Sequence, residues 1–125
     1  MSNRLGTLVL GASEKADRYS HLAVVSLRNH RHPVYAVGRK SGQIQDVPIV
    51  TAISSDWAID TVTLYLNPDH QQAYYDSIIA LRPRRLIFNP GTENPLFEEK
   101  ARQAGIITQE ACTLVLLQTG QYHLY

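Results

Sequence analysis

The sequence predicts an α/β protein, a Rossmann-like three-layer sandwich with a five-stranded, mainly parallel sheet and helices on both faces. Five short runs rich in β-branched and other apolar residues alternate with segments whose apolar residues recur at helical spacing. The chain has 125 residues, the size of one ordinary domain, and 44% of them are hydrophobic, enough for one core. We therefore expect residues 1–125 to form a single domain.

The first elements form a strand, turn and helix unit. Residues 5–10 are an apolar run that stops at Gly11, which is typical of a strand buried on both faces and followed by a tight turn. Residues 19–29 place their apolar side chains on one helical face. A second strand is expected at 33–37 and ends at Gly38, which completes a βαβ unit.

Prolines indicate where several elements in the middle of the chain begin or end. Pro48 cannot donate to a strand ladder, so residues 46–50 are expected as an edge piece that leads into a turn of helix around 54–58. A clearer strand is expected at 61–66, and Asn67 can cap a helix that begins at Pro68. The elements expected after it are the rest of that helix to about Leu81, a strand at 85–88, a helix from Pro95 that ends at Gly105, a strand at 106–109 and a helix at 113–119.

Composition excludes several classes of partner. The net charge of +1 gives no large field that would attract nucleic acid or an anionic membrane. No apolar run approaches the roughly 20 residues that span a bilayer, and residues 1–4 lack the apolar core of a signal peptide. The single cysteine, Cys112, allows no internal disulfide and fits a reducing compartment. We expect a cytoplasmic protein.

The sequence contains no recognisable catalytic or metal-binding motif. The five histidines show no spacing typical of zinc, and neither a nucleophile elbow nor a phosphate-binding P-loop is present. Cys112 precedes an apolar helix, which could stabilise a thiolate, although a buried structural cysteine is the favoured interpretation. We therefore expect no metal and no catalytic residue, and leave open whether any reaction is catalysed.

Ligands of open parallel sheets bind beyond the carboxyl ends of the strands, and the sequence indicates those ends. The turn after the first strand places Gly11, Ser13 and Ala16 where a dinucleotide-binding loop has three glycines, so a ligand-free tight turn is the alternative. The cationic Lys15 and Arg18 favour an anion site. The candidate cofactor-binding residues are Gly11, Ala12, Ser13, Lys15, Arg18, Tyr19, Gly38, Arg39, Lys40, Asn67, Pro68, Asn89 and Pro90.

The second strand end is the more informative one. Proteins that bind the ribose hydroxyls of NAD place an acidic residue there, whereas this chain has Arg39 and Lys40. A cationic pair suits a ribose that carries a phosphate, as in coenzyme A (CoA) or NADP, and a solvated loop is the alternative. Asn67-Pro68 and Asn89-Pro90 are helix-entry or turn sequences, at which ligand contact would be incidental.

The chain resembles the stand-alone CoA-binding domain proteins, which are related to the nucleotide-binding domain of the succinyl-CoA synthetase alpha subunit. The segments that carry the resemblance are residues 8–13, 18–20, 37–40, 47–49, 86–91, 104–106 and 110–112. The resemblance implies that Ser13 and Lys15 lie in a phosphate-binding turn, that Arg39 or Lys40 is the basic residue after the second strand, and that Asn67-Pro68 line the adenosine side. Relatives often have a Val-Asn-Pro type segment where this chain has Gly38-Arg39-Lys40.

Four functions remain open at this stage. The favoured one is non-catalytic binding of CoA or an acyl-CoA, by a sensor, a carrier or a subunit docked to a second copy or a protein partner. The alternatives are an NAD(P)-binding redox sensor or small oxidoreductase, an enzyme that uses Cys112 as nucleophile on an acyl or persulfide group, and a structural subunit with a degenerate pocket. Thioester ligation by this chain is not expected.

Overall fold

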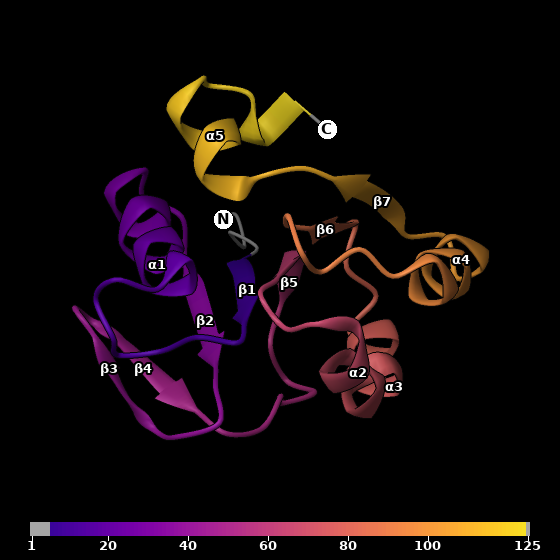
Figure 1. Cartoon of the computed structure of the whole chain (residues 1–125), viewed down its shortest axis with the longest axis horizontal. Helices are drawn as coiled ribbons and strands as arrows, with labels where there is room; N and C mark the ends of the chain where they lie inside the picture. Colours follow the sequence, from indigo (N-terminus) through magenta and orange to yellow (C-terminus); the bar gives the residue numbers. More distant parts are fainter. Residues whose placement is uncertain (1–5, 125) are drawn as a thin grey trace.

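A twisted, mostly parallel sheet forms the middle of the molecule (Figure 1). The computed structural model describes residues 6–124, and within them the sheet has seven strands in the order β3-β4-β2-β1-β5-β6-β7. All neighbouring strands are parallel except β3, which runs antiparallel to β4. The strands are β1 (Gly6–Leu10), β2 (Val34–Val37), β3 (Gly42–Ile44), β4 (Val47–Val50), β5 (Ile59–Leu64), β6 (Arg85–Phe88) and β7 (Ile107–Glu110).

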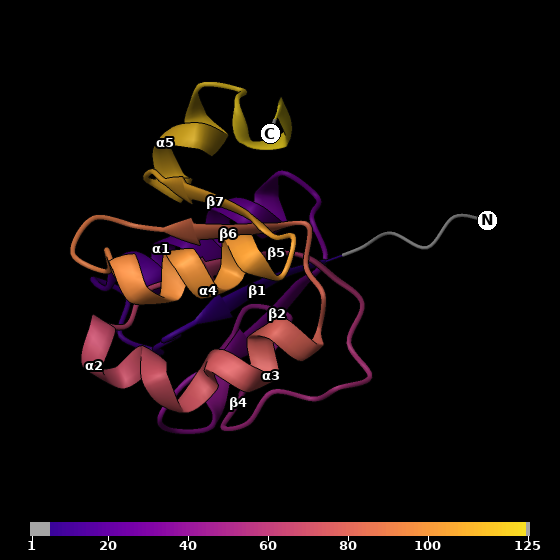
Figure 2. The same ribbon diagram turned by 90° about the vertical axis from the view of Figure 1, so that its right-hand side faces the viewer.

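Helices cover both faces of this sheet, as Figures 1 and 2 show. Helices α1 (Tyr19–Asn29) and α5 (Thr113–Gln118) lie on one face. The other face carries α2 (Pro68–Gln71), the 3₁₀ turn η1 (Gln72–Tyr74), α3 (Tyr75–Ala80) and α4 (Pro95–Gln103), and a last 3₁₀ turn, η2 (Tyr122–Leu124), follows α5. The predicted three-layer Rossmann-like class is confirmed.

Successive residues of β1, the central strand of the sheet, belong alternately to two hydrophobic cores, one on each face. Leu8 and Leu10 of β1 pack with the helices of one face, while Val9 packs with α1 and α5 on the other. All five residues of β1 are buried because both faces of the strand are covered. The apolar run that predicted this strand therefore reflects its central place in the sheet.

The sheet has two more strands than the five predicted. Residues 42–44, for which no strand was predicted, form the edge strand β3, and a two-residue turn at Gln45 and Asp46 joins it to β4. The prediction that residues 46–50 form the edge was therefore wrong, since β4 lies between β3 and β2. Three residues of alternating burial are too short a pattern to identify a strand from sequence, and pairing with β4 is what makes them one.

Two helical expectations also differ from the structure. Residues 54–57 form one hydrogen-bonded turn without a helix, and Trp57 stacks on Tyr35 with ring centres 4.9 Å apart. The helix expected from Pro68 to Leu81 is divided into α2, η1 and α3. Buried Gln71, the last residue of α2, donates to the carbonyl oxygens of Leu66 and Thr92, at 2.8 Å each. The expected strand start at Leu5 lies outside the described residues.

Within residues 6–124, no helix is long and apolar enough to cross a membrane. The same residues contain no group of three or more His, Cys, Asp or Glu side chains placed to hold a metal ion.

Asn94 joins the helices that support the carboxyl edge of the sheet. Its side-chain oxygen accepts the N–H of Phe97 at 3.1 Å and caps α4. Its amide nitrogen donates to Gln71 Oε1 and to Tyr75 Oη, both at 2.9 Å. Asn67 caps α2 in the same way, through the N–H of His70 at 3.0 Å, but it is exposed and makes no comparable side-chain bonds.

We therefore expect Asn94→Ala to lower the free energy of unfolding by about 2–3 kcal/mol, because it removes a cap and two buried hydrogen bonds. Asn67→Ala, which removes a cap alone, should cost about 1 kcal/mol. Urea denaturation of both variants measures the difference. Equal losses would contradict a special role for Asn94.

Candidate functional site

The turn after β1 is held against the end of β2 by one carbonyl group. The N–H groups of Gly11 and Ala12 both donate to the carbonyl oxygen of Val37, at 2.8 and 2.9 Å. Gly11 has a φ of +101°, a conformation that favours glycine, and a Cβ there would lie 3.1 Å from the backbone of Tyr65. The turn thus fits closely between the ends of β2 and β5.

Gly38 permits the closest approach at this edge. A Cβ on Gly38 would lie 2.3 Å from the carbonyl oxygen of Ala12, a distance that no side chain allows. The chain leaving β2 therefore passes directly against the turn that leaves β1. The exposed pair Arg39 and Lys40 follows this contact at once.

A second contact joins the loops beyond these strands. The carboxylate of Glu14, in the loop from β1 to α1, accepts the N–H of Gln43 at 2.7 Å. The Glu14 side chain also packs against the backbone at Gly42, where a larger residue would have to displace it. The loop that carries Lys15 and Arg18 therefore lies beside the loop that carries Arg39 and Lys40.

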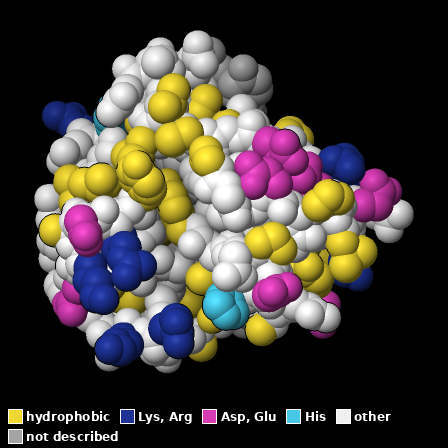
Figure 3. Space-filling view, viewed as in Figure 1, with side chains coloured by type: hydrophobic (Ala, Val, Ile, Leu, Met, Phe, Trp, Pro, Cys, Tyr) yellow, Lys and Arg dark blue, Asp and Glu magenta, His cyan; other side chains and the backbone are white. Residues whose placement is uncertain are grey.

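These four cations are exposed, and Figure 3 shows lysine and arginine side chains gathered over this part of the molecule. Helix α1 begins here without a side-chain cap and without an acidic residue in its first turn. The N–H groups at the start of a helix carry partial positive charge and attract anions. The structure thus brings the predicted residues of the first two strand ends together at one cationic edge.

A pocket of about 270 Å³ opens farther along the same edge, lined by Tyr19, Tyr65, Asn89, Pro90, Cys112 and Leu114. Tyr19, Asn89 and Pro90 are among the predicted residues. Tyr65 was missed because the predicted strand ran to Leu66, whereas β5 ends at Leu64 and leaves Tyr65 in the loop. Leu114 gave no signal beyond its place in an apolar helix, and Cys112 was interpreted as a structural residue.

Buried polar groups surround the inner end of this pocket. Asn89 donates to Thr63 Oγ1 at 2.7 Å and to the Leu64 carbonyl at 2.8 Å, and it accepts the N–H of Thr113 at 2.9 Å. The hydroxyls of Thr63 and Thr113 bond to each other at 2.8 Å. Asn89 therefore ties β5, β6 and the start of α5 together.

Tyr65 is the exception in this polar cluster. Its hydroxyl is buried and makes no hydrogen bond to another described residue, although the hydroxyls of Thr63 and Thr113 lie near it. Burial, together with the nearby thiol of Cys112, raises the pKa of the phenol well above its ordinary value. Tyr65 therefore remains a neutral hydroxyl that can donate a hydrogen bond.

Asn67 and Pro68 follow Leu66, whose side chain lies beside Gly11, but neither lines the pocket. Pro68 is the first residue of α2, and Asn67 is its capping residue, as the sequence indicated. Both are exposed at the carboxyl side of β5. Their observed contacts are those of helix entry.

A parallel sheet with a glycine turn leading to an open helix start, beside a second strand followed by Gly38, is typical of the Rossmann-like class of α/β folds. Comparison with protein families makes the class more specific. The family described as CoA binding domain matches residues 6–118, and the chain belongs to that family.

Solved structures agree with this fold. A crystal structure of an uncharacterized protein is 42% identical, with a TM-score of 0.90, and the match covers 96% of this chain and 99% of the other. A hypothetical protein from Pyrococcus horikoshii OT3 is 23% identical, with a TM-score of 0.81 and coverage of 90% and 81%. A protein from Thermus thermophilus is 20% identical, with a TM-score of 0.79 and coverage of 94% and 90%. No curated protein matches the chain.

Gly38→Ala tests the close approach at the edge. We expect a loss of about 1–3 kcal/mol in the free energy of unfolding, because the new methyl group must displace the Ala12 carbonyl. Ser41→Ala, an exposed change in the same loop, should stay within about 0.5 kcal/mol of the parent protein. Chemical denaturation measures both, and a Gly38→Ala protein of unchanged stability would refute the contact.

Two tyrosine variants test the unpartnered hydroxyl. Tyr65→Phe should leave stability unchanged or raise it by up to about 1 kcal/mol, because it removes a buried group that has no partner. Tyr122→Phe should cost about 1–3 kcal/mol, since it leaves the buried Thr7 hydroxyl without its bond of 2.6 Å. Thermal and urea unfolding compare the pair. Similar losses in both would mean that Tyr65 has a partner in solution.

Proposed function

We propose that this chain is a small cytoplasmic domain that binds CoA or an acyl-CoA along the carboxyl edge of its sheet without transforming it. The observation that carries the proposal is the joining of two cationic loops by Glu14 and Gln43, in a chain whose family is the CoA binding domain. The ligand's phosphates would lie over these loops and the open start of α1.

The cationic pair after β2 supports a phosphorylated ribose. Arg39 and Lys40 follow the Gly38 contact and are both exposed, so they can turn toward an anion. A ribose with free hydroxyls would instead call for an acidic residue at this position. The 3′-phosphate of CoA supplies the anion that the pair can bind.

The pocket lined by Tyr19 and Tyr65 can accommodate the pantetheine end of the ligand. Its volume of about 270 Å³ is too small for a nucleotide but fits a pantetheine end or a short acyl group. Tyr65 offers an unused hydroxyl there, which could donate to an amide or thioester carbonyl. Tyr19, at the start of α1, links this pocket to the cationic loops.

The polar groups at this edge support binding more than catalysis. The Asn89 side chain is committed to three internal hydrogen bonds. Tyr65 cannot act as a base near neutral pH because burial keeps its pKa raised. Among the residues that line the pocket, no acid–base pair is bonded in a way that would activate Cys112.

Thermal unfolding with and without ligand tests the proposal. At a concentration 100 times its Kd, CoA should stabilise the chain by about 2.7 kcal/mol and raise Tm by roughly 10 °C. Dephospho-CoA should give a smaller rise, and Arg39→Ala/Lys40→Ala should abolish the difference between the two ligands. Lys100→Ala/Arg102→Ala, a matched pair of exposed cations on α4, should keep it.

The outcomes separate the alternatives. A larger rise with NADPH than with CoA would favour the redox protein, and no rise with any nucleotide in a folded chain would favour a structural subunit. Equal rises in Tm with CoA and dephospho-CoA would refute the role of Arg39 and Lys40 in binding the 3′-phosphate, but they would leave CoA binding itself supported. Mass spectrometry of small molecules that copurify with the protein would identify the acyl group.

A further inference from the structure

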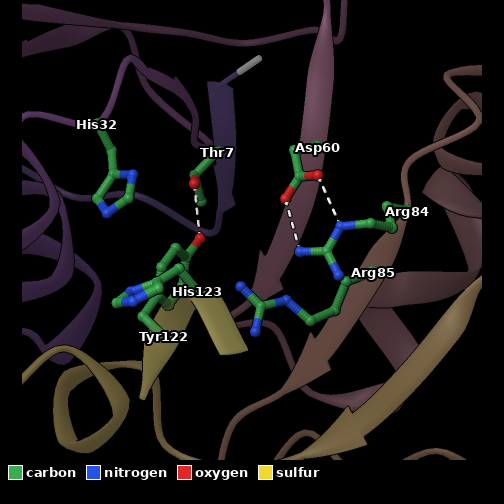
Figure 4. A pocket seen from close by; sticks show the side chains of 7 residues that line it. All are labelled: Thr7, His32, Asp60, Arg84, Arg85, Tyr122 and His123. Carbon is green, nitrogen blue, oxygen red and sulfur yellow. Dashed lines mark hydrogen bonds and ion pairs between the residues drawn. The ribbon is translucent and has the colours of Figure 1, made fainter. Parts of the chain in front are cut away.

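A second pocket, of about 310 Å³, lies at the opposite, amino-terminal edge of the sheet (Figure 4). Thr7 of β1, Asp60 of β5 and Arg85 of β6 line it from the strands, and Tyr122 of η2 lines it from the end of the chain. Along β1, Thr7 and Gly11 are about 13 Å apart. The pocket is therefore distinct from the proposed CoA site.

Arg85 is the unusual residue of this pocket. Its side chain is fully buried, at 0% exposure. Nε donates to Thr61 Oγ1 at 3.2 Å, and Nη1 reaches Gln109 Oε1 at 3.4 Å. Nη2 has no partner among the described residues, and Figure 4 shows the guanidinium directed toward the space beside Tyr122 and His123.

The positive charge of Arg85 also lacks a direct counter-ion, since Asp60 is linked to it only through the Thr61 hydroxyl, which accepts from Arg85 Nε and donates to Asp60 Oδ2. Within residues 6–124, no carboxylate forms an ion pair with it. The nearby carboxylate of Asp60 is already bonded to Arg84, at 2.9 and 3.1 Å. Burial pushes the pKa of Asp60 upward, but hydrogen bonds from Arg84 and Thr61 together lower it below its ordinary value, so Asp60 is charged and committed to that pair.

A buried charge without a counter-ion is costly, and the ring of Tyr122 compensates for only part of the cost. The Arg85 Cζ lies 4.4 Å from the centre of that ring, which is a cation–π contact. Removing an ion from water costs more than one such contact returns. An anion in the pocket would supply both the missing charge and an acceptor for Nη2.

We infer that this pocket binds an oxyanion, the carboxylate or phosphate group of a small molecule, with the Arg85 guanidinium as its principal contact. A planar guanidinium suits the two-oxygen geometry of either group. The Thr7 and Tyr122 hydroxyls, bonded to each other at 2.6 Å, lie at the same pocket and can offer a further donor. The pocket's volume is at the lower limit for ligand sites, which favours a small metabolite over a nucleotide.

Thermal unfolding with inorganic phosphate and with acetate, each against chloride at equal ionic strength, tests the site. Either anion at saturation should raise Tm by several degrees beyond chloride. Phosphate alone would indicate a phosphate ligand, and acetate alone a carboxylate. Arg85→Met should reduce the rise, whereas Arg102→Met, the same change at an exposed arginine on α4, should keep it in full. No rise beyond chloride, or a rise as large in Arg85→Met as in the parent protein, would overturn the proposal.

Two controls make the result specific. Arg39→Ala/Lys40→Ala should keep the rise with phosphate; its loss there would assign the anion to the nucleotide edge and overturn this proposal. CoA should still stabilise Arg85→Met, so failure of one site is visible apart from failure of the other. If Arg85→Met does not fold, a crystal of the parent protein soaked in selenate decides the matter. An anomalous peak within hydrogen-bond distance of the Arg85 guanidinium supports the site, and its absence there refutes it.

Discussion

The arrangement of the loops at the carboxyl ends of the strands depends on one group, the carbonyl of Val37. It accepts the N–H groups of both Gly11 and Ala12, and it can do so only because Gly38 has no side chain to separate the two strand ends. This contact sets the paths of the loops that follow β1 and β2. The bond from Gln43 to Glu14 then keeps these loops together, so that cations from two parts of the chain share one surface. A negative side chain is thus used to assemble a positive edge.

The two pockets differ from the rest of the buried polar structure in the hydrogen bonding of their side chains. Asn89, Asn94 and Gln71 each satisfy several groups of different elements, and such satisfied networks fix how the elements pack. Among the described residues, only two buried side-chain atoms lack a hydrogen-bond partner: the Tyr65 hydroxyl and Nη2 of Arg85. Each lies at a pocket, one at either edge of the sheet. Unsatisfied groups are costly, so their coincidence with both pockets supports a ligand at each.

Local signals predicted most elements because they depend on neighbouring residues. The Asn67 cap followed by Pro68, the Gly11 turn and the apolar runs of the central strands all formed as expected. The hairpin of β3 and β4 was missed because its short strands exist through pairing, and a three-residue strand has no period to detect. The candidate site was predicted at the level of strand ends, since parallel strands bring their carboxyl ends to one edge whatever their order.

The sequence alone determined that this protein is a Rossmann-like α/β domain with cations after its first two strands. Hydrophobic periodicity, helix caps and turns depend on residues that are close together in the sequence. The tertiary structure decided which of those residues meet. Nothing in the sequence distinguishes Arg84 from Arg85, yet one pairs with Asp60 near the surface while the other is buried without a counter-ion. The Tyr65 hydroxyl is likewise left without a hydrogen bond near the bonded hydroxyls of Thr63 and Thr113, which are 50 residues apart in the sequence. Whether a polar group is satisfied depends on neighbours that only the folded chain brings together.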